Sequence, residues 1–186
     1  MKWTIDKSFD FCYGHRVHNQ ALNAEYVGTE GTCLKCRHIH GHQGKLKMFL
    51  ESNTLTDGMV TDFKHLGWLR DFIDDVLDHK FIMDINDPLI THEVPDYIID
   101  NALDLGKCIH YDNDYWVLNL DKLDKDINQA IYEKYEGFIF VDFVPTSENI
   151  TSWLLTIAQR KMKDLDIKVV SAEYWETPKS HCKVEV

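Results

Sequence analysis

The stretch His40-Gly41-His42-Gln43-Gly44-Lys45-Leu46-Lys47-Met48-Phe49-Leu50 alternates between two kinds of side chain. One parity holds both histidines, Gly44 and the apolar residues Leu46, Met48 and Leu50, whereas Gln43, Lys45 and Lys47 lie on the opposite parity. Side chains two residues apart on a strand point to the same face of a sheet. The pattern therefore predicts a half-buried strand whose buried face begins with two imidazoles.

The N-terminal segment has the same period. Alternate residues of this segment are mostly apolar or aromatic, and the last of them is a histidine: Trp3, Ile5, Phe9, Phe11, Tyr13 and His15. Consecutive antiparallel strands are commonly neighbours in a sheet. We therefore expect His15 to lie opposite His40 and His42.

The rest of the chain adds helices and further strands. Apolar residues at helical spacing predict one helix from Thr61 to Leu77 and another from Thr146 to about Lys163. Strands are expected over Phe138 to Val144 and Ile167 to Thr177. This order predicts an α+β fold in which an antiparallel sheet carries the helices on one face.

The pattern is less regular from about 88 to 137. Here we expect a short helix over Tyr97 to Leu105 and a hairpin over Lys107 to Leu120, which turns at Asp112-Asn113-Asp114. A further helix is expected from Leu123 to Tyr135.

Composition excludes several classes of protein. The chain has 186 residues, is 44% hydrophobic and carries a formal net charge of -11, with a pI near 5.3. These values are unlike those of a disordered chain, and an acidic protein is a poor nucleic-acid ligand. No apolar run is long enough to span a membrane, and Met1-Lys2-Trp3-Thr4-Ile5-Asp6 lacks the apolar centre of a signal peptide. We expect a cytoplasmic protein with reduced thiols and with neither a membrane nor a nucleic acid as partner.

The acidic residues are unevenly distributed. No Asp or Glu occurs from Gly31 to Leu50, a window that contains Lys35, Arg37, Lys45 and Lys47. One interpretation is a cationic site for a small anion. The alternative is a solvated strand face that happens to carry lysines.

The histidine pair suggests a metal site. His40 and His42 can bind one ion from the same strand face, and His15 would complete a three-histidine site of the catalytic type with an open position. The alternative is a structural, non-catalytic zinc site made of Cys33, Cys36, His40 and His42. In the first case, Cys36 beside Lys35 and Arg37 is suited to act as a thiolate base or nucleophile.

Several motifs, in chain order, resemble those of one enzyme family. They are Phe11-Cys12-Tyr13-Gly14-His15-Arg16, Cys36-Arg37-His38-Ile39-His40-Gly41-His42, Gly58-Met59-Val60-Thr61-Asp62-Phe63, Leu77-Asp78-His79-Lys80, Pro145-Thr146-Ser147-Glu148-Asn149 and Glu176-Thr177. Together they resemble the 6-pyruvoyl-tetrahydropterin synthase and 6-carboxy-tetrahydropterin synthase superfamily. Individually, the Asp-His pair and the two glutamates would be unremarkable.

The resemblance implies a T-fold, a single domain over 1–186 with an insertion at about 88–137, and a Zn²⁺ cofactor held by His15, His40 and His42. It implies that Cys36, Asp78 and His79 are catalytic. Thr146, Ser147, Glu148 and Glu176 would bind the pterin. It also implies a homo-oligomer, by family analogy a hexamer, with sites at subunit interfaces.

The spacing of the Cys-His motif resembles one branch of the superfamily. Three residues separate Cys36 from His40, as in the carboxy branch of bacterial queuosine biosynthesis. The implied reaction converts 7,8-dihydroneopterin triphosphate to 6-carboxy-5,6,7,8-tetrahydropterin and releases acetaldehyde and triphosphate. Elimination of triphosphate by a pyruvoyl-type enzyme is the alternative. In either case the cationic window would meet the triphosphate.

The chain departs from the family pattern in three places. Gly44 stands where the family usually has an aromatic residue, and Cys33 is an additional thiol. The segment at about 88–137 replaces a short connection.

Overall fold

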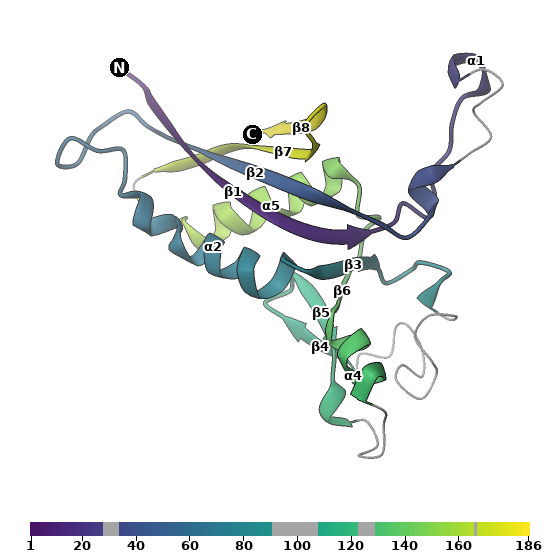
Figure 1. Ribbon diagram of the computed structural model, residues 1–186. Coiled ribbons are helices and arrows are strands. Elements are labelled where there is room, and N and C mark those ends of the chain that lie inside the picture. The colour runs from purple at the N-terminus through teal and green to yellow at the C-terminus, as the bar shows by residue number, and fades with distance from the viewer. Residues whose placement is uncertain (28–33, 91–107, 123–128, 166) are drawn as a thin grey trace. The chain divides into compact units, whose positions relative to one another are not determined.

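A computed structural model describes residues 1–27, 34–90, 108–122, 129–165 and 167–186 (Figure 1). The strands are β1 (Trp3–His15), β2 (His40–Ser52), β3 (Lys80–Asp84), β4 (Cys108–Tyr111), β5 (Tyr115–Leu118), β6 (Phe138–Val141), β7 (Lys168–Thr177) and β8 (Ser180–Glu185). The helices and helical turns are α1 (Ala24–Val27), η2 (Lys35–Arg37), η3 (Phe63–Leu66), α2 (Gly67–Phe72), η4 (Ile73–Leu77), η5 (Leu120–Lys122), α4 (Gln129–Glu136) and α5 (Ser147–Lys161).

The described strands form one mixed sheet in the order β4-β5-β6-β3-β1-β2-β7-β8. The predicted α+β class is confirmed, and β1 and β2 are neighbours as expected. The sheet is not wholly antiparallel, because β3 and β6 pair in parallel with Phe81 opposite Phe138. The chain between these strands is long enough for the crossover connection that parallel pairing requires.

Residues of the chain cluster into two compact units. The first comprises Met1–Tyr13, His42–Asp78 and Ser147–Val186, and the second comprises Gly14–Gly41 and His79–Thr146. Both β1 and β2 contribute residues to each unit.

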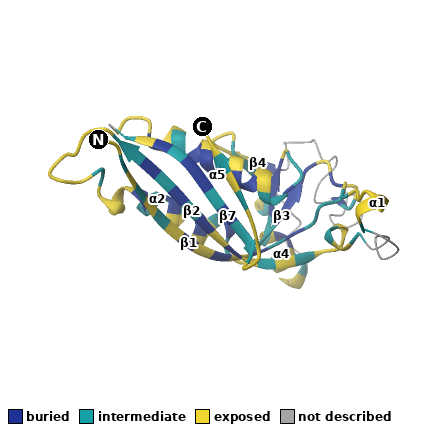
Figure 2. Ribbon diagram, turned by 90° about the horizontal axis from the view of Figure 1, so that it is seen from above, coloured by how far each residue is buried: buried dark blue, intermediate teal, exposed yellow. Residues whose placement is uncertain are grey.

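In the first unit, alternating side chains bury one face of the sheet. Leu46, Met48 and Leu50 are fully buried, as the period of the sequence predicted. Figure 2 shows the alternation as bands of buried and exposed residues along β1 and β2. Helix α5 packs on β7 (Figure 1). Phe72 of α2 contacts Trp153 of α5, with ring centroids 5.9 Å apart.

The helix predicted from Thr61 to Leu77 is not one regular α-helix. It begins at Phe63 as a 3₁₀ turn, continues as α2 and ends as the π-helical turn η4. Of the apolar residues predicted to form its buried stripe, Leu66, Leu69, Ile73 and Leu77 are buried and Val76 is partly buried, whereas Phe63 at its start is exposed. The sequence therefore predicted most of the buried face, but the spacing of these residues did not indicate the changes from 3₁₀ to α and from α to π helix.

The second unit contains a hydrophobic cluster of its own. Its buried members are Met83, Ile90, Cys108, Leu118, Tyr135 and Phe140. The hairpin predicted over Lys107 to Leu120 is confirmed as β4 and β5, with Asp112 and Asn113 in the left-handed region at the turn. Residues from α4 and the hairpin thus pack against β3 and β6.

Two strands, β3 and β8, were not predicted from the sequence, and two predicted helices lie wholly or partly outside the described residues. β3 is a short apolar run without alternation, and β8 has only two partly buried positions, Cys182 and Val184, so the signal of each strand is weak. The helix predicted over Tyr97 to Leu105 lies outside the described residues. Only the second half of the helix predicted from Leu123 to Tyr135 is described, as α4.

Gly44 is in close contact with the ring of Tyr174. A Cβ added at Gly44 would lie 2.6 Å from the phenol oxygen of Tyr174, which is fully buried on β7. Tyr174 pairs with Leu46, so Gly44 is its diagonal neighbour across the strands. The aromatic group at this position therefore comes from β7 and not from β2.

We expect Gly44→Ala to lower the free energy of unfolding by about 1–3 kcal/mol, because the added methyl group overpacks a buried ring. Gly67→Ala is the matched control, since a Cβ there meets no atom within 4 Å and the residue has a helical φ of -58°. This control should be more stable than the wild type by about 0.5 kcal/mol. Urea denaturation measures both, and equal stability of Gly44→Ala and the wild type would contradict the prediction.

Candidate metal and catalytic site

Three histidines come together at the ends of two neighbouring strands. His15 ends β1 and is 1% exposed, whereas His40 and His42 begin β2. Each offers one ligand atom, and these atoms all lie within 4.8 Å of one another. Three imidazole nitrogens gathered this closely form a group that could hold one metal ion. The predicted metal residues are therefore brought together.

Backbone carbonyls orient two of these rings. Nδ1 of His15 lies 2.6 Å from the carbonyl oxygen of Pro145, and Nδ1 of His40 lies 2.8 Å from that of His38. A carbonyl oxygen only accepts, so Nδ1–H is the donor in both pairs. This tautomer places the ligand lone pair on Nε2, the arrangement typical of metal-binding histidines. The donor set thus fits a zinc ion.

Glu176 lies beside the third histidine. Its Oε1 is 3.6 Å from Nε2 of His42, and both side chains are partly exposed. The phenols of Tyr13 and Tyr174 lie in the same unit, and burial raises the pKa of both above the usual range of tyrosine. The Glu176 carboxylate raises both pKa values further, so these phenols stay neutral. The surroundings of Glu176 therefore contain neutral donors and a histidine.

Cys36 lies in the short turn η2 and is partly buried as a free thiol. Its carbonyl oxygen accepts a hydrogen bond of 2.7 Å from the backbone N–H of Val17. Val17 follows His15 by two residues. The backbone of Cys36 is thus hydrogen-bonded to the segment that follows β1.

Asp78 and His79 lie directly after the π-helical turn. The N–H of Asp78 donates to the carbonyl of Ile73 over 2.8 Å, and its carboxylate accepts from the N–H of Cys12 over 2.7 Å. His79 is exposed and has a φ of 59°. A non-glycine residue in this region costs about 1–3 kcal/mol, and such strain concentrates at functional sites.

The residues predicted to bind the pterin lie on two elements. Thr146 donates its N–H to the carbonyl of Val144 over 2.7 Å, immediately after Pro145. Ser147 begins α5, and the exposed Glu148 lies in its first turn, where a carboxylate interacts favourably with the helix dipole. Glu176 lies near the end of β7.

Two lysines of the cationic window, Lys45 and Lys47, lie next to carboxylates of β1 in the fold. The ammonium group of Lys45 lies 3.7 Å from Asp10, and that of Lys47 lies 3.3 Å from Asp6. Both lysines also occupy the parity of β2 opposite to His42. The prediction that the whole window meets a triphosphate is therefore unsupported for these two residues, because side chains of opposite parity point to opposite faces.

The alternative set of zinc ligands is only partly described. Cys33 lies outside the described residues. Of the described residues, His15, His40 and His42 form the group with metal-binding spacing. Both zinc hypotheses share His40 and His42, and they differ in His15 and the two cysteines.

Sequence reasoning missed the groups that orient the site. The carbonyls of Pro145 and His38 have no side-chain signal, although Pro145 directly precedes the predicted Thr146-Ser147-Glu148 motif. Tyr174 was missed as well, because nothing in a strand sequence says which neighbour fills the space beside a glycine.

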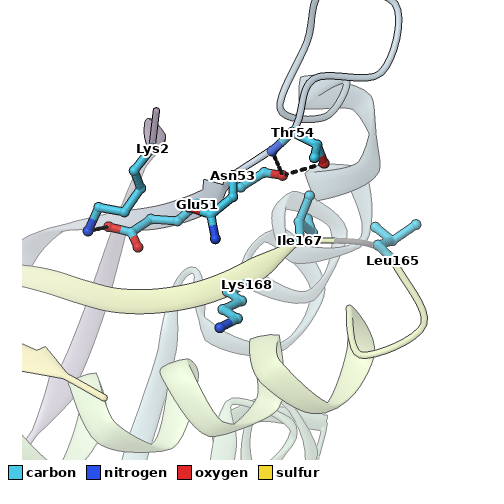
Figure 3. Close-up of a pocket in the computed structure, with 8 residues that line it drawn as sticks. Lys2, Glu51, Asn53, Thr54, Leu165, Ile167 and Lys168 are labelled. Carbon is cyan, nitrogen blue, oxygen red and sulfur yellow. Dashed lines mark hydrogen bonds and ion pairs between the residues drawn. The ribbon is translucent and has the colours of Figure 1, made fainter.

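A hollow lies at the end of β2 that is distant from the histidines. It measures about 400 Å³ and is lined by Lys2, Glu51, Ser52, Asn53, Thr54, Leu165, Ile167 and Lys168 (Figure 3). Lys2 and Glu51 form an ion pair of 2.9 Å there. Glu51 follows His42 along the same strand by roughly 30 Å, so this hollow is separate from the histidines.

No helix in the described part of the chain has both the length and the apolar character needed to cross a membrane.

The chain is similar to known proteins over nearly all of its length. A family model described as 6-pyruvoyl tetrahydropterin synthase matches residues 4–186. The 6-carboxy-5,6,7,8-tetrahydropterin synthase of Aquifex aeolicus is 30% identical over 97% of this chain and 96% of its own.

Solved structures have the same architecture. An uncharacterised protein from Wolinella succinogenes is 45% identical and has a TM-score of 0.91, covering 100% of this chain and 98% of that one. The 6-pyruvoyl tetrahydropterin synthase of Caenorhabditis elegans is 19% identical with a TM-score of 0.55, covering 100% and 96%. The second likeness concerns the fold alone.

Proposed function

Because the chain belongs to the 6-pyruvoyl tetrahydropterin synthase family, we propose that it is a zinc-dependent lyase acting on 7,8-dihydroneopterin triphosphate. The products would be 6-carboxy-5,6,7,8-tetrahydropterin, acetaldehyde and triphosphate, a step in queuosine biosynthesis. The observation that carries the proposal is the group of three histidine ligand atoms within 4.8 Å, in a chain similar throughout to a 6-carboxy-tetrahydropterin synthase.

His15, His40 and His42 would hold the zinc ion. A zinc ion bound there supplies Lewis-acid polarisation of the oxygens on the substrate side chain. The Pro145 and His38 carbonyls support this role, because each holds a ring in the tautomer with Nε2 available as a ligand. The chain thereby presents neutral imidazoles to the metal.

Cys36 would act as the base. As a thiolate it would take a proton from the carbon of the side chain adjacent to the polarised oxygen. Its location in a short turn bonded to Val17 supports this assignment, because Val17 is close in sequence to the ligand His15.

Asp78 and His79 would supply the proton that is needed when the triphosphate leaves. The imidazole of His79 would donate or relay a proton as the triphosphate leaves, with Asp78 as its partner in the pair. The left-handed backbone of His79 is consistent with a site where strain is retained for function.

Glu176 would hold the pterin. Its carboxylate can accept two hydrogen bonds from the amino and ring N–H groups of the heterocycle, a bidentate match. Thr146, Ser147 and Glu148 would bind the remaining edge of the ring. Neutral Tyr13 and Tyr174 near Glu176 add donors without adding a competing charge.

We also propose the assembly and location implied by the family. The chain would form a homo-oligomer, by analogy a hexamer, with sites at subunit interfaces, and would act in the cytoplasm on a small-molecule substrate. The segment at about 88–137 would be an insertion within one domain. The packing of α4 and the β4–β5 hairpin against β3 and β6 is consistent with this role.

Incubation of the zinc-loaded protein with dihydroneopterin triphosphate tests the proposal. We expect acetaldehyde, triphosphate and a carboxypterin, identified by mass spectrometry. Triphosphate with a pyruvoyl-type pterin and no acetaldehyde would instead favour the second branch of the family. A metal-loaded protein that releases no triphosphate would favour the non-catalytic zinc hypothesis.

A further inference from the structure

The residues that follow β1 contact Cys36 on both sides of its α-carbon. Val17 N–H donates to the Cys36 carbonyl over 2.7 Å. The Cys36 N–H donates to the side-chain oxygen Oε1 of Gln20 over 3.0 Å. Both peptide groups that flank the Cys36 side chain are therefore fixed by the segment 17–20.

Gln20 also receives the neighbouring arginine. The guanidinium of Arg37 donates to the main-chain carbonyl of Gln20 through Nε at 2.9 Å and Nη2 at 2.6 Å. Gln20 itself is held in a turn, because its N–H donates to the carbonyl of Val17 over 3.1 Å. Gln20 thus binds the turn η2 at two successive residues.

The same segment is anchored on its other side by buried carboxylates. Arg16 Nε lies 3.1 Å from Asp87, and His18 Nε2 lies 2.9 Å from Asp84. Asp84 and Asp87 are 4% and 3% exposed. The Arg16–Asp87 ion pair fixes geometry, since Asp87 alone would be an uncompensated buried charge. The contact between His18 and Asp84 is a hydrogen bond to a second buried carboxylate.

The carboxylates are held in turn by the backbone after β3. Asp84 accepts from the N–H of Asn86 over 2.8 Å, and Asp87 accepts from the N–H of Leu89 over 2.8 Å. The segment 16–20 is therefore bonded both to the hydrogen-bonded turn after β3 and to the turn that carries Cys36. A displacement of this segment would move Cys36.

We propose that Gln20 is a positioning residue that holds Cys36 in the geometry required for proton transfer. The inference rests on the proposed function, in which Cys36 is the base. Gln20 does not need to touch the substrate, because it acts through the Cys36 peptide N–H. Proton transfer is sensitive to distance, and a misplacement of about 1 Å can cost about 100-fold in rate.

Gln20→Met and Gln20→Glu separate this role from simple packing. Methionine keeps the length of the side chain and removes the acceptor, whereas glutamate keeps an acceptor for the Cys36 N–H. Both variants keep the main-chain carbonyl that binds Arg37. Asn19→Met is the control, since Asn19 is the exposed neighbour.

We expect Gln20→Met to lower kcat by about 10- to 100-fold, with KM changed by less than about 3-fold and zinc content unchanged. Gln20→Glu should recover most of kcat, and Asn19→Met should match the wild type. Hydrogen exchange of the Cys36 amide should accelerate in Gln20→Met and not in Gln20→Glu, which is a readout independent of turnover.

Three results would overturn the proposal: wild-type kcat in Gln20→Met, a kcat in Gln20→Glu as low as in Gln20→Met, or a loss of activity that follows loss of zinc. Failure of the proposed function gives a different result. In that case the wild-type protein converts no dihydroneopterin triphosphate, and the positioning role fails with it. An active wild type with an equally active Gln20→Met removes only the role of Gln20.

Discussion

Replacing Cys36 with alanine is expected to lower turnover of dihydroneopterin triphosphate by about 10²- to 10⁴-fold while zinc remains bound, because a positioned general base contributes about this much to a rate. Cys36 is not among the three residues with metal-binding spacing. Its loss should therefore remove the base and leave the ligands in place. The measurements are triphosphate release under saturating substrate and zinc content by elemental analysis.

Cys182→Ala is the matched control for this variant. Cys182 is also a partly buried free thiol, but it lies on β8 and has no role in the proposed site. It should retain wild-type turnover and zinc. A Cys36→Ala protein that keeps full turnover would refute the role of base, and one that loses its zinc would favour the structural site built on cysteines.

Replacing His15 with alanine is expected to reduce bound zinc from a stoichiometric amount to a residual one and to abolish turnover. Removal of one of three imidazoles leaves a two-ligand site, too few to retain zinc against a chelator. Zinc content after dialysis against a weak chelator measures the effect. Cys33→Ala should keep its zinc in the same assay.

The rival zinc site predicts the reverse pattern, with zinc retained in His15→Ala and lost in Cys33→Ala. Because His15 is 1% exposed, the alanine variant must first be shown to be folded by circular dichroism. His40→Gln is a second test on a more exposed ligand of the proposed site. This variant does not discriminate between the two zinc sites, but retention of zinc in it would contradict both.

The gathering of His15, His40 and His42 could be predicted because these residues follow simple periods. His40 and His42 share a strand face with Leu46 and Met48, and His15 ends the buried parity of β1. Burial of the apolar residues fixes the register of these strands, since a slip by one residue would expose them. The same hydrophobic pattern that formed the sheet therefore directed the imidazoles to one face.

The helix before Asp78 could be predicted only in part. Leu66, Leu69, Ile73 and Leu77 recur at helical spacing and are buried as expected. The π-helical turn at its end has no separate period, because a single wide turn shifts the stripe by only one position. The strained backbone of His79, which follows this turn, could not be read from the sequence either.

By itself, the sequence determined the α+β class, the histidine-bearing strands and the family, because hydrophobic periods and motif order are local properties of a chain. Tertiary structure alone decided which carbonyls orient His15 and His40, that Tyr174 fills the space beside Gly44, and that Gln20 binds the Cys36 peptide. It also placed Lys45 and Lys47 next to acidic partners on β1. These contacts join residues distant in sequence through backbone atoms or pairwise fit, which a pattern of residue types does not encode.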